Sequence, residues 1–200
     1  MVATIGIYQA YGGTDANPAS ESTDLSSAST RLQTKDQFAA TDTTYPIPIP
    51  ASGQFNYSYW IHVYLRITGG SFTKVNNIRF YSDGAIGWNF GTGGALNRGN
   101  RDSGDKGAPM NTEYDVATGT ESTTGHEIGV VTNGHDYFNG QSTKTASVAS
   151  DTSAAPATID STDHTTTGLC KAVVLQVKVA SDATQGEQTD ETLTFKYDEI

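Results

Sequence analysis

Hydrophobic and polar residues alternate most regularly over residues 54–68. One parity of this stretch holds only apolar and aromatic residues: Phe55, Tyr57, Tyr59, Ile61, Val63, Leu65 and Ile67. Successive side chains of a strand point to opposite faces, so this parity predicts the core face of a long β-strand. The other parity carries Trp60 and Tyr64, which are large for a solvent-facing surface. We expect these two rings to contact either a neighbouring subunit or a second layer of the same chain.

Weaker alternation predicts further strands on both sides of this one. Residues 4–11 and 71–82 both show it. The parity of the second stretch breaks between Phe72 and Val75, which predicts a β-bulge near residues 74–77. No segment carries the apolar stripe of an amphipathic helix. Shorter strands are expected at 85–90, 112–118 and 127–132.

The last thirty residues predict a closing pair of strands. Residues 171–180 and 191–200 both alternate, and the polar turn between them contains Gly186. The second run places Leu193, Phe195 and Tyr197 on one face. We expect the two runs to pair as a β-hairpin, with the second strand fixed inside a sheet.

Long polar segments separate the expected strands. Residues 12–50 hold few large apolar groups before the run Tyr-Pro-Ile-Pro-Ile-Pro at 45–50. Proline fixes φ and lacks an N–H donor, so this run is extended and is not a central strand. The segment is predicted to be either a subunit-spanning arm or a long surface loop. Further long loops are expected at 91–111 and 141–168.

The composition favours an all-β fold. Serine and threonine make up roughly a quarter of the residues, and β-branched threonine suits pleated positions. A chain of 200 residues usually forms one domain. We therefore expect a single domain over residues 1–200, an antiparallel β-sandwich of the Ig-like or jelly-roll type with long polar loops.

Charge and cysteine content exclude several classes of protein. The chain has 22 acidic and 12 basic residues, a net charge of −10 that disfavours a nucleic-acid partner. No apolar run approaches the ~20 residues needed to span a bilayer, so no membrane partner is expected. The N-terminal residues lack the features of a signal peptide, which predicts synthesis and folding in a cytoplasm. The single Cys170 is expected to be a small buried hydrophobe and not a reactive thiol.

No group of residues has the spacing of a known catalytic or metal motif. The glycine-rich run 91–94 lacks the lysine and the following helix of a phosphate-binding loop. His126 and His135 lack the i, i+4 spacing of a zinc-binding helix. The acidic turn 102–105 lacks the spacing of a calcium-binding EF-hand loop. The sequence therefore predicts no catalytic residue, no metal site and no cofactor.

Residues 170–200 carry a resemblance to a known class of proteins. The strand Val-Val-Leu-Gln-Val-Lys-Val-Ala, the turn Ala-Thr-Gln-Gly and the ending Thr-Leu-Thr-Phe-Lys-Tyr-Asp-Glu-Ile resemble the closing hairpin of structural proteins from tailed viruses of bacteria and archaea. In those proteins such strands complete a β-sandwich. The resemblance is confined to this segment and carries over no catalytic residue.

The resemblance implies a non-enzymatic virion protein of the head-decoration, tail or adaptor type. Such a protein contacts itself and other virion proteins and is located in the virus particle. The candidate interface residues are Tyr45, Ile47, Ile49, Trp60 and Tyr64. The alternative function is a carbohydrate-binding or adhesive β-sandwich, in which exposed aromatic residues such as Trp88 stack on a host-surface glycan. An enzyme, such as a glycan depolymerase, needs a carboxylate pair that the sequence does not place.

Overall fold

The computed structural model describes residues 2–13, 18–100, 119–128 and 145–200. Within these ranges the regular secondary structure consists of β-strands and short 3-10 helices, which confirms the all-β prediction. The elements are β1 (Ala3–Tyr11), β2 (Ser20–Glu21), η1 (Leu25–Ser27), β3 (Phe55–Tyr57), β4 (Ile61–Gly70), β5 (Val75–Tyr81), β6 (Ala95–Asn100), β7 (Thr145–Ser147), η4 (Val148–Ser150), β8 (Ala157–Asp160), β9 (Gly168–Ala180) and β10 (Thr194–Glu199). No helix of the described part is long and apolar enough to cross a membrane.

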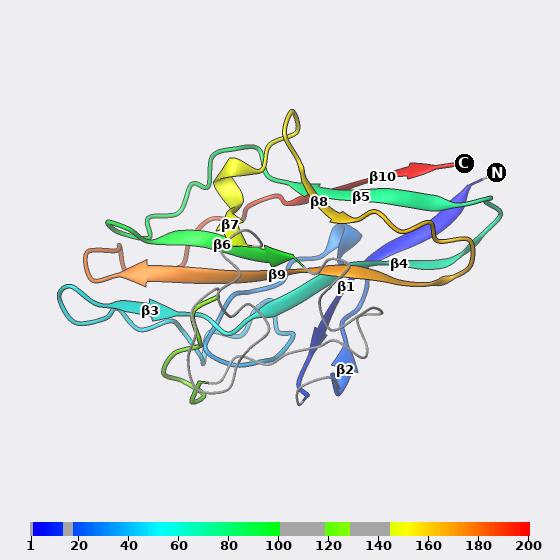
Figure 1. Ribbon diagram of the computed structural model, residues 1–200. Helices are drawn as coiled ribbons and strands as arrows, with labels where there is room; N and C mark the ends of the chain where they lie inside the picture. The colour runs from blue at the N-terminus through cyan, green and yellow to red at the C-terminus, as the bar shows by residue number, and fades with distance from the viewer. Residues whose placement is uncertain (1, 14–17, 101–118, 129–144) are drawn as a thin grey trace.

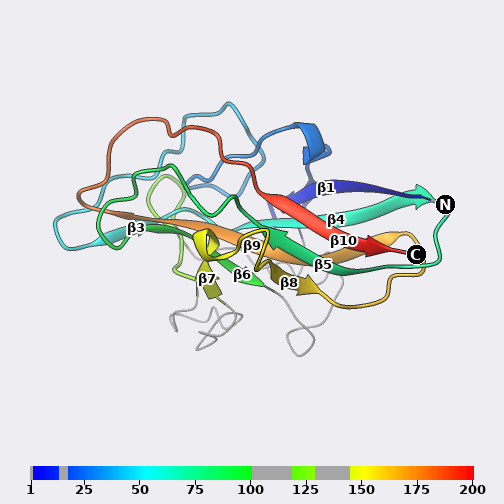
Figure 2. The ribbon, with the colours of Figure 1, turned by 90° about the horizontal axis from the view of Figure 1, so that it is seen from above.

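The strands form two antiparallel sheets. In the described ranges the larger sheet has the order β2-β1-β4-β9-β6-β7, with β3 also paired to β9, and the smaller has the order β10-β5-β8. Figure 1 shows the smaller sheet lying over the larger one as a second layer. Seen from above, the strands of the two layers run in broadly similar directions, as in an aligned β-sandwich (Figure 2).

The main hydrophobic core lies between the two sheets. Strand β4 contributes Ile61, Val63, Leu65 and Ile67, all buried, so the alternation seen in the sequence is confirmed for this half of the stretch 54–68. The long central strand β9 contributes Val173, Leu175, Val177 and Val179 from the same sheet. The smaller sheet contributes Val75, Ile78, Phe80 and Ile159, with Phe195 and Tyr197 packed beside them.

The predicted strand 54–68 is interrupted at residues 58–60. Here the amide of Ser58 donates to Val177 O at 3.0 Å and the amide of Tyr59 donates to Gln33 O at 2.8 Å. The chain thus leaves β3 and enters β4 on a changed parity. As a result Tyr59 packs beside Trp60 in a separate cluster and does not continue the core face.

The predicted closing hairpin is wrong. Strand β9 lies in the middle of the larger sheet, whereas β10 pairs with β5 at the edge of the smaller sheet. The polar segment 181–193 therefore passes from one layer to the other. The predicted burial of Leu193, Phe195 and Tyr197 still holds, because these side chains pack against the core from the smaller sheet.

Several predicted loops contain strands, and one predicted strand is absent. Segment 91–111 contains β6, and segment 141–168 contains β7, η4 and β8, while residues 85–90 form no strand. Of the expected strand 127–132 only residues 127 and 128 are described, and they are not in a strand; 112–118 lies outside the described residues. Strand β6 depends on pairing with β9 and β7, partners that are distant in sequence, so its local pattern carries little signal.

The predicted bulge in the strand 71–82 is confirmed. Opposite β10, the register of β5 shifts between the pairs Arg79–Lys196 and Asn76–Asp198. Asn77 lies at this shift with a φ of 52°, a left-handed conformation that asparagine tolerates better than most residues. The segment 12–50, in its described part, packs on its own chain: Ser22, Gln33 and Thr34 are buried.

Candidate binding cleft

A cleft of about 580 Å³ opens beside the C-terminal part of β9, where Val177 and Val179 form part of its lining. One wall is built by residues from 29–49 and the other by 184–190, with Trp88, Asn89 and Phe90 between them. In Figure 1 the end of β9 lies far from the two chain termini. The volume falls in the range of ordinary ligand sites in proteins.

The proline-rich wall is held in place by hydrogen bonds to its carbonyl groups. The hydroxyl of Thr34 donates to Tyr45 O at 3.2 Å and to Pro46 O at 3.1 Å. Asn56 Nδ2 donates to Pro48 O at 2.8 Å. With these carbonyls bonded to the protein, the wall offers mainly the side chains of prolines and of Ile47 and Ile49 to the cleft. An extended segment without backbone donors at three of its positions thus forms a rigid apolar surface.

The opposite wall is attached to the aromatic end of the cleft. The indole Nε1 of Trp88 donates to Thr189 O, and Asn89 Nδ2 donates to Thr184 Oγ1 at 2.7 Å. Trp88 and Phe90 pack edge to face, with ring centroids 5.7 Å apart and planes at 69°. The segment 85–90, predicted as a strand, therefore serves as a connector whose aromatic side chains fill the space beside the cleft.

One ion pair joins the two walls. Arg31 Nη2 contacts Glu187 Oε1, and Arg31 Nε also donates to Ala40 O at 3.2 Å. The Glu187 side chain is 65% exposed, so the pair contributes little to stability and lies at the surface of the cleft. Nearby, hydrogen bonds from Thr44 and Gln37 lower the pKa of Asp42. Asp42 is thus an ionised hydrogen-bond acceptor at neutral pH.

Three of the five candidate interface residues line this cleft. Tyr45, Ile47 and Ile49 are all partly buried and all belong to the proline-rich wall. Trp60 and Tyr64 do not reach it, because both lie on the outer face of the larger sheet and each is only 2% exposed. Of the two predicted environments for these rings, the structure confirms contact with other parts of the same chain.

Separate segments of the chain cover Trp60 and Tyr64. Trp60 Nε1 donates to His126 O at 2.6 Å, so the segment 119–128 lies over the indole. Tyr64 stacks on Tyr8 with centroids 6.4 Å apart, and its hydroxyl donates to Glu21. Burial raises the pKa of Tyr64, and the hydrogen bond to the Glu21 carboxylate adds to the effect.

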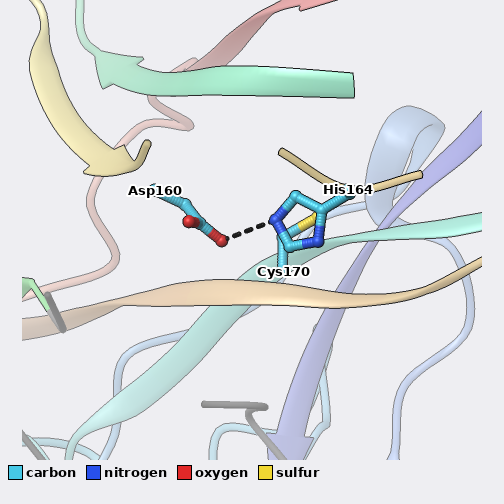
Figure 3. Close-up of side chains that lie close together, drawn as sticks. All are labelled: Asp160, His164 and Cys170. Atoms are coloured by element: carbon cyan, nitrogen blue, oxygen red, sulfur yellow. Dashed lines mark hydrogen bonds and ion pairs between the residues drawn. The ribbon is translucent and has the colours of Figure 1, made fainter. Parts of the chain in front are cut away.

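A second group of ligand-type side chains lies between the two sheets. Asp160 at the end of β8, His164 in the following segment and Cys170 of β9 offer ligand atoms that all lie within 4.8 Å of one another (Figure 3). His164 Nε2 is 2.9 Å from Asp160 Oδ2. The spacing of these residues, four and six positions, matches no sequence motif, and the fold brings them together beside β9.

The pKa values of Asp160 and Cys170 are shifted in opposite directions. For Asp160, burial by itself raises the pKa, but hydrogen bonds from His164, Lys171 N and Thr162 N outweigh it and lower the pKa to about 2. For Cys170, burial raises the pKa of the thiol to about 12, with a contribution from the Asp160 charge. Cys170 is a buried neutral thiol, in agreement with its interpretation as a small hydrophobe.

The other candidates from the sequence have structural roles or lie outside the described residues. In the glycine-rich run 91–94, the amide of Thr92 donates to Asp182 Oδ1 at 2.8 Å, so this turn binds a carboxylate of its own chain. His126 contacts Trp60 edge to face. His135 and the acidic turn 102–105 lie outside the described residues.

Comparison of the chain with protein-family models, with curated proteins and with solved structures gives no match.

Proposed function

We propose that the protein is a non-enzymatic structural component of a virus particle, of the capsid-decoration, tail or adaptor type. Its cleft receives an extended apolar segment of a neighbouring copy of the chain. The observation that carries the proposal is the cleft itself, with a rigid wall of prolines and isoleucines facing an aromatic end. The resemblance of residues 170–200 to tailed-virus structural proteins supports the virion as the setting.

The lining of the cleft suits a polypeptide with apolar side chains. Ile47 and Ile49 are only partly buried and offer aliphatic surface, which gains free energy by excluding water from similar groups; the buried Val177 and Val179 complete this part of the lining. The wall is already fixed by Thr34 and Asn56, so little conformational entropy is lost on binding. A preformed apolar cleft therefore favours a docking function.

Two carboxylates in the lining of the cleft, Asp42 and Glu187, support the non-enzymatic part of the proposal. A glycoside hydrolase needs one carboxylic acid whose pKa is raised, so that it holds a proton at working pH. Asp42 has a lowered pKa, and Glu187 is paired with Arg31. Neither of these two carboxylates has the environment of a general acid.

Removal of apolar side chains from the cleft tests the docking step. The double variant Ile47→Ser with Ile49→Ser is expected to weaken self-association by about tenfold or more, since full burial of an isoleucine side chain contributes about 1.5–3 kcal/mol and a tenfold change corresponds to about 1.4 kcal/mol. Ile7→Ser is the matched control, because Ile7 is also partly buried against the core but lies outside the cleft. Sedimentation equilibrium of the three proteins, each checked for folding, gives the association constants. Equal constants for the cleft variant and wild type would refute the cleft as the contact.

A carbohydrate-binding module is the second candidate function. Trp88 is partly exposed in the cleft, and the amide groups of Asn89, Gln185 and Gln188 lie beside it. Amides beside an aromatic ring are a common combination in sugar-binding sites. This function predicts that the isolated monomer binds glycans and that Trp88→Ala abolishes binding, whereas assembly through the cleft predicts self-association without glycan.

A further inference from the structure

Asp160, His164 and Cys170 come together from three separate segments. Figure 3 shows the carboxylate, the imidazole and the thiol converging between β8, the segment after it and β9. Carboxylate oxygen, imidazole nitrogen and thiolate sulfur are the three kinds of protein ligand that zinc accepts.

The distances within the cluster are close to those of a metal site. Zinc–ligand bonds of about 2.0–2.3 Å place the ligand atoms of a tetrahedral site roughly 3.3–3.8 Å apart. Here the pair His164 Nε2 and Asp160 Oδ2 is 2.9 Å apart, and all three ligand atoms lie within 4.8 Å. An ion placed between them requires these separations to change by about 1 Å or less.

A bulge in β9 creates this arrangement. Tyr64 pairs with Ala172 and Arg66 pairs with Leu169, so Cys170 and Lys171 together face one residue of β4. The bulge turns the Cys170 side chain into the core between the sheets, and it aims Lys171 N at Asp160 Oδ2 over 2.9 Å. Bulges commonly re-aim side chains at functional sites.

The surroundings of Asp160 provide the outer hydrogen bonds that a metal ligand needs. Thr162 N donates to Oδ1 at 2.9 Å, and Lys171 N donates to Oδ2. Both bonds come from the backbone and remain when an ion replaces the contact with His164. Such outer bonds orient the carboxylate toward the ion.

We propose that Asp160, His164 and Cys170 form a binding site for a zinc-type divalent ion, which ties the two sheets of the sandwich together. The carboxylate, His164 Nε2 and the Cys170 thiolate are three ligands, and water occupies the fourth position. The thiol proton passes to solvent when the ion binds. The charges of the ion, the thiolate and the carboxylate then sum to zero, which permits burial. The His164 side chain is 17% exposed and provides the route of entry.

Cobalt(II) is the probe that tests the site, because sulfur coordination gives an intense charge-transfer absorption in the near ultraviolet. Cys170 is the only cysteine, so any such band reports on this residue. Wild-type protein titrated with Co²⁺ at neutral pH is expected to show this band with one equivalent bound, and Zn²⁺ is expected to displace it. Absence of the band, or binding at more than one undefined site without it, would overturn the proposal.

Variants distinguish coordination from a structural effect. Cys170→Ala is expected to lose the band, and His164→Gln, at a partly exposed position, to weaken binding by about tenfold or more. Asp163→Asn is the matched control, since Asp163 lies next to His164 in sequence but bonds Lys74 and Asn76. If Cys170→Ala fails to fold, the His164→Gln result decides. Unchanged Co²⁺ affinity in His164→Gln would contradict the site, as would weakened affinity of equal size in Asp163→Asn.

Discussion

Gln176 Nε2 donates to the carbonyl oxygen of His126 at 2.6 Å, joining residues that are 50 positions apart in the chain. The same nitrogen donates to Ser58 O at 2.9 Å, and Gln176 Oε1 accepts from Ile128 N at 2.8 Å. One fully buried side chain thus holds the segment 119–128 against the outer face of the larger sheet. That segment covers Trp60, which explains why this ring is unavailable to a partner.

Replacement of Gln176 by leucine is expected to destabilise the protein by about 2–4 kcal/mol. The substitution keeps the side-chain size but leaves Ile128 N and Ser58 O without this partner, whereas His126 O keeps its hydrogen bond from Trp60 Nε1. Each unsatisfied buried group costs about 1–3 kcal/mol. Urea unfolding followed by tryptophan fluorescence measures the change. Gln54→Leu, at an exposed position, is the control and should change the free energy of unfolding by less than about 0.5 kcal/mol. A loss below about 1 kcal/mol in Gln176→Leu would contradict the role of this side chain.

The buried pair of Arg98 and Asp151 is expected to contribute far more than the exposed pairs. Arg98 makes a two-point contact with the carboxylate, with Nη2 to Oδ1 at 2.8 Å, and the side chains are 11% and 6% exposed. Arg98→Ala leaves a buried carboxylate without its cation and should cost about 3–5 kcal/mol. Arg66→Ala removes an exposed pair with Glu21 and should cost less than about 1 kcal/mol. Thermal or urea unfolding of both variants measures the loss of stability in each. Similar losses in Arg98→Ala and Arg66→Ala would contradict the larger contribution of the buried pair.

Because of Asp36, we expect the free energy of unfolding to decrease as the pH rises from about 4 to about 6. Burial raises the pKa of this carboxyl from 3.8 to about 6, despite hydrogen bonds from the amides of Gly12 and Gly13. In that range the folded state binds more protons than the unfolded state, so the free energy of unfolding decreases with pH, by an amount on the order of 3 kcal/mol. Asp36→Asn should remove this decrease and be more stable than wild type at pH 7. A stability difference between the two proteins that is constant from pH 4 to pH 7 would rule out this effect.

Because of Asp160, we expect the free energy of unfolding to increase with pH in the acid range. Its pKa is lowered to about 2, so its contribution to stability is complete above about pH 4 and disappears as the pH falls through about 2. Asp160→Asn should lose on the order of 2–3 kcal/mol at neutral pH and show a weaker acid transition than wild type. Chemical unfolding at a series of pH values measures both effects. Asp190→Asn, at an exposed position, should keep the acid transition of wild type. An unaltered transition in Asp160→Asn would contradict the prediction.

Local alternation was a reliable guide to the core but not to strand pairing. The residues Ile61 to Ile67 face the core as their pattern predicts, because a strand with one buried face must alternate. Alternation does not say which sheet a strand joins. Strands β9 and β10 follow one another with a turn-like segment between them, and yet they lie in different layers. Four of the six residues of strand β6 are glycine or polar, and the strand is defined by its pairing with β9 and β7.

The candidate residues are predictable only in part for the same reason. The sequence predicts Tyr45, Ile47 and Ile49 as contacts because they belong to the polar segment 12–50, and the structure places them in the lining of the cleft. Trp60 and Tyr64 have the pattern of surface residues, but segments distant in sequence cover them. The cluster around Cys170 depends on a bulge that inserts one extra residue into β9 opposite β4. The local sequence pattern does not predict this bulge.

Assembly through the cleft is tested most directly by the mass of the purified protein, measured by light scattering at several concentrations. The proposal predicts a defined oligomer whose mass is a whole multiple of 21.2 kDa. It also predicts that the double variant at Ile47 and Ile49 dissociates to the monomer at concentrations where the Ile7→Ser control does not. A strict monomer at every concentration, or an oligomer unaffected by the cleft variant, would contradict the proposal.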